Sequence, residues 1–149
     1  AGRGPRGALM IYLTNRQRRV RIPAAEVRRL AARIAGDRSL SIAFVGNAEI
    51  RALNRRFLGH DDATDVLAFP LGTDLFGEVV VSAEVAAAEA RRRGIPVKEE
   101  LLRYVVHGLL HLLGYDDHRP ADRKRMWARQ ERELREFLGG RGRRGFRGR

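Results

Sequence analysis

The sequence predicts a single domain of the α+β or α/β class, built around one small mixed β-sheet. Its 149 residues suit one hydrophobic core, and 44% of them are hydrophobic. Four short stretches have the two-residue period of a β-strand, and about five others have the 3.6-residue period of an α-helix. The pattern does not by itself establish the order or the direction of the strands.

The first half of the chain alternates strands with helices. Leu9–Leu13 is expected to form the first strand. Pro23 is expected to be the first residue of a helix that ends near Ala35, because its fixed φ suits a first turn that needs no amide proton. The elements that follow are a strand over Leu40–Val45 and a helix over Ala48–Phe57 with Asn47 as its N-cap.

Two further strands and three helices are expected in the second half. They are strands Val66–Phe69 and Glu78–Ser82, a helix ending at Arg93, a long helix Val97–Leu113 and a last helix over about Pro120–Leu138. The last helix is expected to pack through Met126, Trp127, Leu134, Phe137 and Leu138. Gly139 and Gly140 are expected to end it. Residues 8–138 would then form the folded domain, and 139–149 a disordered, arginine- and glycine-rich basic tail.

The charge balance predicts a polyanionic partner such as nucleic acid. The formal net charge is +12, from 30 Lys and Arg against 18 Asp and Glu. The alternative is that arginine only solvates the surface. The chain has no cysteine, so thiolate metal sites are excluded. No stretch approaches the roughly 18–20 apolar residues of a membrane span, and the first apolar run is too short for a signal peptide. A cytoplasmic protein with no membrane partner is expected.

Three of the four histidines lie within twelve residues, at a spacing typical of a metal site. His107 and His111 are four residues apart, so on a helix they share one face. Gly114 suits a left-handed turn that would return the chain and bring His118 as a third ligand. Three protein ligands leave a zinc ion one open position, as in catalytic sites. The alternative is a set of hydrogen-bonded core histidines.

The spacing also resembles the HExxH motif of metalloproteases but lacks its general base. Gly108 occupies the position of that glutamate, where it could let substrate or another backbone approach closely. A zinc ion with an open position can supply hydroxide near neutrality and stabilise charge on a phosphodiester. Together with the net charge, such a site predicts a metal-dependent nuclease.

Three blocks of sequence are similar to those of the YbeY family of metal-dependent endoribonucleases. They are His107–His118, Leu53–Pro70 with its Leu-Asn and Thr-Asp-Val-Leu-Ala-Phe-Pro segments, and Phe76–Ser82. The resemblance implies an α+β fold in which a four-stranded mixed sheet packs with helices and the histidine helix lies at a cleft. It implies one zinc ion per chain, held by His107, His111 and His118. It also implies cleavage of single-stranded RNA in ribosomal RNA maturation and quality control, in association with the small ribosomal subunit and its assembly factors.

Two departures from the family pattern affect the site. In the commonest form the third histidine directly follows Gly-Tyr-Asp, whereas here Asp117 intervenes before His118. Either the loop bulges or Asp117 takes a ligand's place, and His118 is favoured because imidazole matches the other two ligands. The family's arginine for substrate phosphate falls on Leu58, so Arg55 or Arg56, one turn earlier, is the expected substitute.

Three functions therefore stand as hypotheses. The first is a zinc-dependent, single-strand-specific endoribonuclease of ribosomal RNA. The second is a ribosome-associated RNA-binding factor whose metal is mainly structural, which the missing arginine at Leu58 motivates. The third is a zinc peptidase, which would need a base from elsewhere in the fold because Gly108 cannot supply one.

Overall fold

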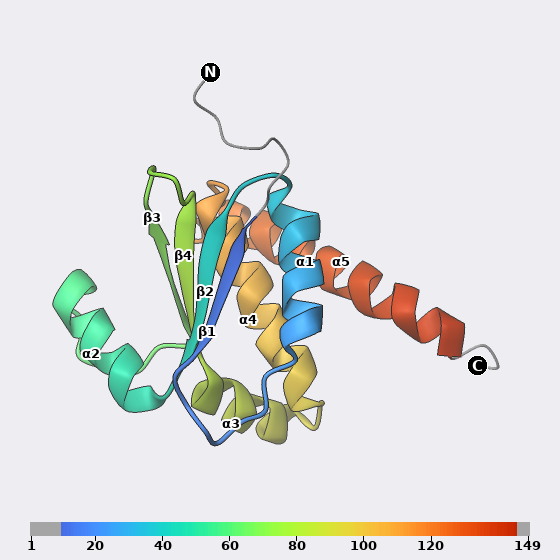
Figure 1. Cartoon of the computed structure of the whole chain (residues 1–149), viewed down its shortest axis with the longest axis horizontal. Coiled ribbons are helices and arrows are strands. Elements are labelled where there is room, and N and C mark those ends of the chain that lie inside the picture. The colour runs from blue at the N-terminus through green and yellow to red at the C-terminus, as the bar shows by residue number, and fades with distance from the viewer. Residues whose placement is uncertain (1–9, 146–149) are drawn as a thin grey trace.

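The computed structural model describes residues 10–145, and it contains one four-stranded mixed sheet with helices on both faces (Figure 1). The strands are β1 (Ile11–Asn15), β2 (Leu40–Val45), β3 (Val66–Pro70) and β4 (Gly77–Ser82). They lie in the order β1-β2-β4-β3. β1, β2 and β4 are parallel, whereas β3 pairs antiparallel with β4 at the edge. The predicted α+β class and mixed sheet are confirmed.

Five helices surround this sheet in the part of the chain that is described. They are α1 (Ala24–Ala35), α2 (Asn47–Leu58), α3 (Ala83–Arg93), α4 (Val97–Leu112) and α5 (Pro120–Gly145). α1 and α4 lie on one face of the sheet and α2 lies alone on the other, while α5 packs on α4 (Figure 1). Between residues 10 and 145, no helix is long and apolar enough to cross a membrane.

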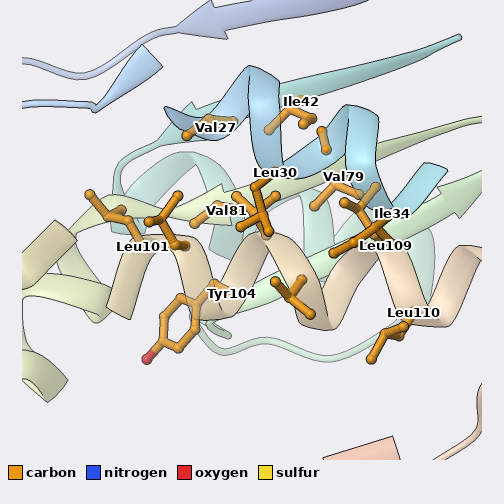
Figure 2. Packing of buried hydrophobic residues seen from close by; sticks show 14 of the residues in the cluster. Val27, Leu30, Ile34, Ile42, Val79, Val81, Leu101, Tyr104, Leu109 and Leu110 are labelled. Carbon is orange, nitrogen blue, oxygen red and sulfur yellow. The ribbon is translucent and has the colours of Figure 1, made fainter. Parts of the chain in front are cut away.

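The main core lies between α4, α1 and the sheet. Figure 2 shows Leu30 and Ile34 of α1 beside Leu109 of α4, with Val79 and Val81 of β4 behind them. A smaller core of Ala43, Val45, Ile50, Leu67 and Val80 lies under α2. α4 is therefore enclosed on several sides, which gives a rigid support for the histidines it carries.

Several expected boundaries differ from the observed ones. β1 begins at Ile11 and runs on to Asn15, and Leu9 lies outside the described residues. Pro23 is the N-cap of α1 rather than its first helical residue. Asn47 is the first residue of α2 rather than its cap. Its backbone N–H donates to the carboxylate of Glu84, 2.7 Å away, so a side chain from α3 satisfies the amide at the start of α2.

The last helix differs from the prediction in two ways. Met126, Leu134 and Phe137 are buried as expected, but the side chain of Trp127 is exposed. Consecutive residues are about 100° apart around a helix, so Trp127 cannot share the inward face of Met126. The helix also continues through Gly139 to Gly145, because glycine weakens a helix by about 1 kcal/mol without ending it. Residues 146–149 lie outside the described part, and the predicted disorder of the tail stays a prediction.

Candidate metal centre

α4 places two imidazoles beside each other on a half-exposed strip in the otherwise buried second half of the helix. Most residues of Leu101–Leu112 are buried, while His107 and His111 keep side-chain exposures of 29% and 31%. Their ring centroids are 4.7 Å apart and their Nε2 atoms are 3.2 Å apart. The predicted pairing of the two histidines on one helical face is confirmed.

Gly108 brings this helix close to the sheet. A Cβ atom at this position would lie 2.5 Å from Cγ1 of Val79 and 3.1 Å from Cγ2 of Val66. A side chain fits there only if the side chain of Val79 shifts. The glycine therefore serves packing against β3 and β4, and the position that holds the catalytic glutamate of metalloproteases faces the sheet here. This geometry argues against the peptidase hypothesis.

The turn after α4 brings a carboxylate to the histidine pair. Gly114 has a φ of 101°, in the region that favours glycine, so the predicted turn is confirmed. Oδ2 of Asp117 lies 3.4 Å from Nε2 of His111 and 3.8 Å from Nε2 of His107. A ligand atom from each of these three residues lies within 4.8 Å of the others.

The structure does not bring His118 to this cluster. Its side chain is 88% exposed, and its Nε2 lies 3.7 Å from a carboxylate oxygen of Asp116. His118, Asp116 and Asp117 form a second, more exposed group of possible ligand atoms within 4.8 Å of one another. The role of His118 as the third ligand stays a prediction, and Asp117 occupies the place expected for it.

The spacing of the three donor atoms fits a divalent ion. Ligands about 2.0–2.1 Å from a tetrahedral zinc ion stand roughly 3.3 Å from each other. The observed separations are 3.2, 3.4 and 3.8 Å for the His107–His111, His111–Asp117 and His107–Asp117 pairs. Two imidazole nitrogens and a carboxylate oxygen are also a donor set that zinc and other first-row divalent metals accept. The residues present fit a metal ion.

Gln130 of α5 holds the ring of His107 from behind. Its Oε1 lies 2.7 Å from Nδ1 of His107. A carbonyl oxygen carries no proton, so Nδ1 must donate, which leaves a lone pair on Nε2 toward the cluster. Nε2 of Gln130 in turn donates to Glu131 at 3.0 Å, and this bond determines which end of the amide faces His107.

A buried arginine anchors this chain of hydrogen bonds. Arg103, with 8% of its side chain exposed, donates twice to Glu131, at 2.9 and 3.1 Å, and also to Glu99 and Glu100. Burial alone would raise the pKa of Glu131, but the hydrogen bonds from Arg103 and Gln130 outweigh it, so the pKa is lowered. Glu131 is thereby kept ionised and able to accept from Gln130.

The environment of His111 favours its neutral form. Burial lowers the pKa of His111, the neighbouring His107 lowers it further, and the carboxylate of Asp117 opposes both effects only in part. A neutral imidazole is the form that binds a metal ion.

Two cavities adjoin the histidine pair, one beside each ring. A larger one, of about 680 Å³, reaches His107 and is lined on the way by Trp127, Arg92, Arg93 and the loop before β3. A smaller one, of about 320 Å³, reaches His111 and is lined by Leu58 and by residues of β3.

Arg55 and Arg56, the expected substitutes for the family arginine, line neither of these two cavities. Arg55 instead pairs with Asp61 at 3.4 Å. Their phosphate-binding role stays a prediction.

Sequence reasoning missed two groups at this site. Gln130 and Glu131 lie on α5, more than twenty residues after His107, and carry no spacing signal that points to them. Arg92 and Arg93 belong to no motif, and Trp127 was expected only to pack in the core. All three line the cavity beside His107. Nothing in the local sequence distinguishes these roles, because the tertiary packing of α3, α4 and α5 creates the cavity.

Comparisons with known proteins agree with this architecture. The sequence model of a family described as Endoribonuclease YbeY matches residues 12–138. A relative from Anaeromyxobacter sp. strain Fw109-5, named Endoribonuclease YbeY, is 52% identical over 122 residues, which cover 78% of this chain and 62% of the relative. One of the same name from Syntrophotalea carbinolica is 38% identical over 136 residues, covering 81% and 91% of the two chains. The chain thus spans under two thirds of the length of the first of these relatives.

A solved structure shares the fold. The solution structure of TM1509 from Thermotoga maritima superposes with a TM-score of 0.65 and 31% sequence identity. The superposition covers 88% of this chain and 91% of that one. The likeness therefore extends over the sheet and its helices and is not confined to the segment that carries the histidines.

Proposed function

The chain belongs to the YbeY family, and we propose that it is a metal-dependent endoribonuclease that cleaves single-stranded RNA. The observation that carries the proposal is the convergence of Nε2 of His107, Nε2 of His111 and Oδ2 of Asp117 at one point between two cavities. The printed names of the relatives, Endoribonuclease YbeY, support the reaction class.

We take zinc as the metal, with one ion per chain. When bound, the ion supplies Lewis acidity toward a phosphodiester oxygen. The residues of the chain prepare the site for it: Gln130 orients the ring of His107, and burial keeps His111 neutral. The half-exposure of both rings leaves room for a substrate phosphate on the side away from the core.

The cavities on either side of the histidine pair suggest a path for the substrate. A single strand that crosses the site would enter along Trp127, Arg92 and Arg93 and leave past His111 and Leu58. The exposed ring of Trp127 offers a face on which a base can stack. The guanidinium groups of Arg92 and Arg93 pair with Glu89 and Glu100 in the structure, and their remaining N–H groups offer contacts to phosphate. In a duplex the bases are stacked and paired, and two strands are wider than one. This arrangement therefore favours single-stranded RNA.

We further propose ribosomal RNA as the substrate class and the small ribosomal subunit with its assembly factors as partners, in the cytoplasm. The net charge of +12 supports an RNA-rich partner. Residues 139–149, with five arginines, are proposed to add phosphate contacts outside the site. Deleting them is expected to reduce the slope of log Kd for RNA against log salt, since fewer counterions are then released.

The test combines elemental analysis with cleavage of a labelled single-stranded RNA. The wild-type protein is expected to contain about one zinc per chain and to lose cleavage on chelation. His111→Ala is expected to lose both metal and cleavage. His60→Ala is the matched control, because His60 lies exposed in the loop after α2. Cleavage that persists in His111→Ala comes from a contaminating nuclease, and a wild-type protein that is metal-free yet active overturns the proposal.

One observation favours the second candidate, an RNA-binding factor with a mainly structural metal. Leu58, which replaces the family arginine, lines the cavity beside His111, and none of the described residues lining that cavity is a lysine or an arginine. Leu58→Arg separates the two functions. An enzyme that lacks a phosphate contact gains turnover when the cation is restored, whereas a binding factor gains affinity for RNA without turnover.

A further inference from the structure

We propose that Asp117, and not His118, is the third protein ligand of the metal, so that the site has two nitrogen donors and one carboxylate oxygen. This inference rests on the metal dependence proposed above. It differs from the three-histidine set that the sequence resemblance implies. The first support is distance: Oδ2 of Asp117 is 3.4 and 3.8 Å from the two Nε2 atoms, while His118 is 88% exposed and faces Asp116.

The loop itself directs the two side chains in opposite ways. Oδ1 of Asp116 accepts a hydrogen bond from the backbone N–H of His118 at 3.0 Å, which closes a tight Asx turn around Asp117. Nη1 of Arg123 donates to the carbonyl of Asp117, 3.4 Å away. The backbone N–H of Tyr115 donates to the carbonyl of Leu110 at 2.9 Å. With the loop tied at these points, Asp117 points toward α4 and His118 points to solvent.

Charge gives a second support. Among the side chains that the structure describes, those of residues 10–139, the carboxylate of Asp117 forms no ion pair with a lysine or an arginine, and its ion-pair partners are the two imidazoles. A divalent cation between the three groups provides the charge that the carboxylate lacks.

The alternative set of Asp116, Asp117 and His118 is weaker on the same grounds. Its side chains are 51%, 36% and 88% exposed, so water already satisfies most of them. Among the described residues, no side chain accepts a hydrogen bond from the imidazole of His118 in the way that Gln130 does for Nδ1 of His107. Asp117 belongs to both sets, but His107 and His111 are less exposed than Asp116 and His118, and the ring of His107 is oriented by a hydrogen bond.

A carboxylate ligand changes what the site prefers. Oxygen donors suit manganese and magnesium better than imidazole does, and a charged ligand lowers the net charge of the occupied site. Replacing Asp117 by histidine would restore three neutral nitrogen donors. Asp117→His is therefore expected to raise the affinity for Zn²⁺ relative to that for Mn²⁺.

The experiment measures metal binding alone, without RNA. The full-length chain is stripped of metal, and Zn²⁺ affinity is measured by competition with a chromophoric chelator, with the Co²⁺ absorption spectrum as a second readout. Asp117→Asn keeps the size of the side chain and removes its charge. It is expected to weaken Zn²⁺ binding by more than the roughly 10–100-fold that loss of an outer hydrogen-bond partner costs. His118→Ala is expected to stay within about threefold of wild type, as suits a residue outside the ligand set.

The outcomes separate the two proposals. If His118→Ala loses the ion and Asp117→Asn keeps it, the third ligand is His118 and this inference is overturned while metal dependence stands. Equal affinity in all three proteins also overturns it. If the wild-type protein binds neither Zn²⁺ nor Co²⁺, the proposed metal-dependent function fails as well. Unfolding curves of the metal-free variants distinguish loss of a ligand from loss of the fold.

Discussion

Gln130 and His107 lie 2.7 Å apart across the contact between α4 and α5, and their hydrogen bond determines which nitrogen of the imidazole faces the ligand cluster. The oxygen of the amide is turned toward the ring because its nitrogen is bound to Glu131. Arg103 holds Glu131 in place through two hydrogen bonds. The orientation of the half-exposed ring of His107 is thus maintained by a partly buried ionic network on two helices.

Removing this contact is expected to weaken metal binding without unfolding the protein. Gln130→Leu fills a similar volume but cannot accept a hydrogen bond from Nδ1 of His107, so the ring is free to rotate and to change tautomer. Loss of such a partner typically lowers metal affinity about 10–100-fold. Zn²⁺ competition titration measures the change. Gln130→Glu retains an acceptor oxygen. By the same reasoning, its affinity for Zn²⁺ should be no less than about one third of the wild-type affinity. Equal weakening in both variants would contradict an orienting role.

The close approach of α4 to the sheet predicts a steric penalty at Gly108. Gly108→Ala places a methyl group 2.5 Å from Cγ1 of Val79, so we expect a loss of about 1–3 kcal/mol in the free energy of unfolding. Chemical denaturation measures it. Gly139→Ala is the matched control, because this helical glycine has no neighbouring atom within 4 Å of an added Cβ. It should stabilise the helix by up to about 1 kcal/mol.

A double mutant tests the cause of that penalty. In a Val79→Ala background the 2.5 Å contact of the methyl group at position 108 is removed and only the 3.1 Å contact with Cγ2 of Val66 remains, so the added cost of Gly108→Ala should fall well below its value in the wild type. If the cost is the same in both backgrounds, the contact with Val79 is not its origin.

The exposed indole beside His107 predicts a defect in RNA binding. Trp127→Ala is expected to weaken binding of a short single-stranded RNA by about 1–3 kcal/mol, the usual contribution of one stacked base. Fluorescence anisotropy measures it at constant salt. Tyr12→Ala is the control, since Tyr12 is equally exposed (50%, against 53% for Trp127) but lies on the strand at the far edge of the sheet. Similar losses in both variants would argue against a specific path along Trp127.

The ionised state of Glu131 predicts a pH-dependent contribution to stability. Its pKa in the folded protein lies below the ordinary value of 4.5, so the folded state favours the charged form. The resulting stabilisation is fully present above pH 4.5 and is lost as the pH falls through the lowered pKa. Glu131→Gln should therefore cost about 1–3 kcal/mol at pH 7, and the difference from wild type should shrink below pH 4.5.

Urea titrations from pH 7 down to about pH 3 measure this difference, because the range must extend below the lowered pKa of Glu131. Glu136→Gln is the control on the same helix. The ion pair of Glu136 with Arg33 is largely exposed, so its loss should cost no more than about 1 kcal/mol. A cost for Glu131→Gln that stays constant as the pH falls would show that charge is not responsible.

The spacing of the histidines and the periodicity of the hydrophobic residues were sufficient to predict the histidine pair and the strands and helices of the fold. His107 and His111 share a helical face because four residues make about one turn, whatever the rest of the chain does. Gly114 supplies the turn because no other residue adopts its φ so readily. The strands and helices follow from periodicity, and their errors lie at ends such as Asn47, where a side chain from another helix completes the first turn.

The sequence by itself thus determined the α+β class, the pair of imidazoles and the basic character of the chain, because these depend on local periodicity and on composition. The tertiary structure alone decided which residue of the Asp116–His118 loop reaches the histidine pair, that Gln130 orients the ring of His107, and that the side chain of Trp127 is exposed. Each of these depends on how α4, α5 and the loop between them pack. A separation of more than twenty residues between His107 and Gln130 leaves no periodic trace, since contacts between helices are set by packing rather than by the repeat of either helix.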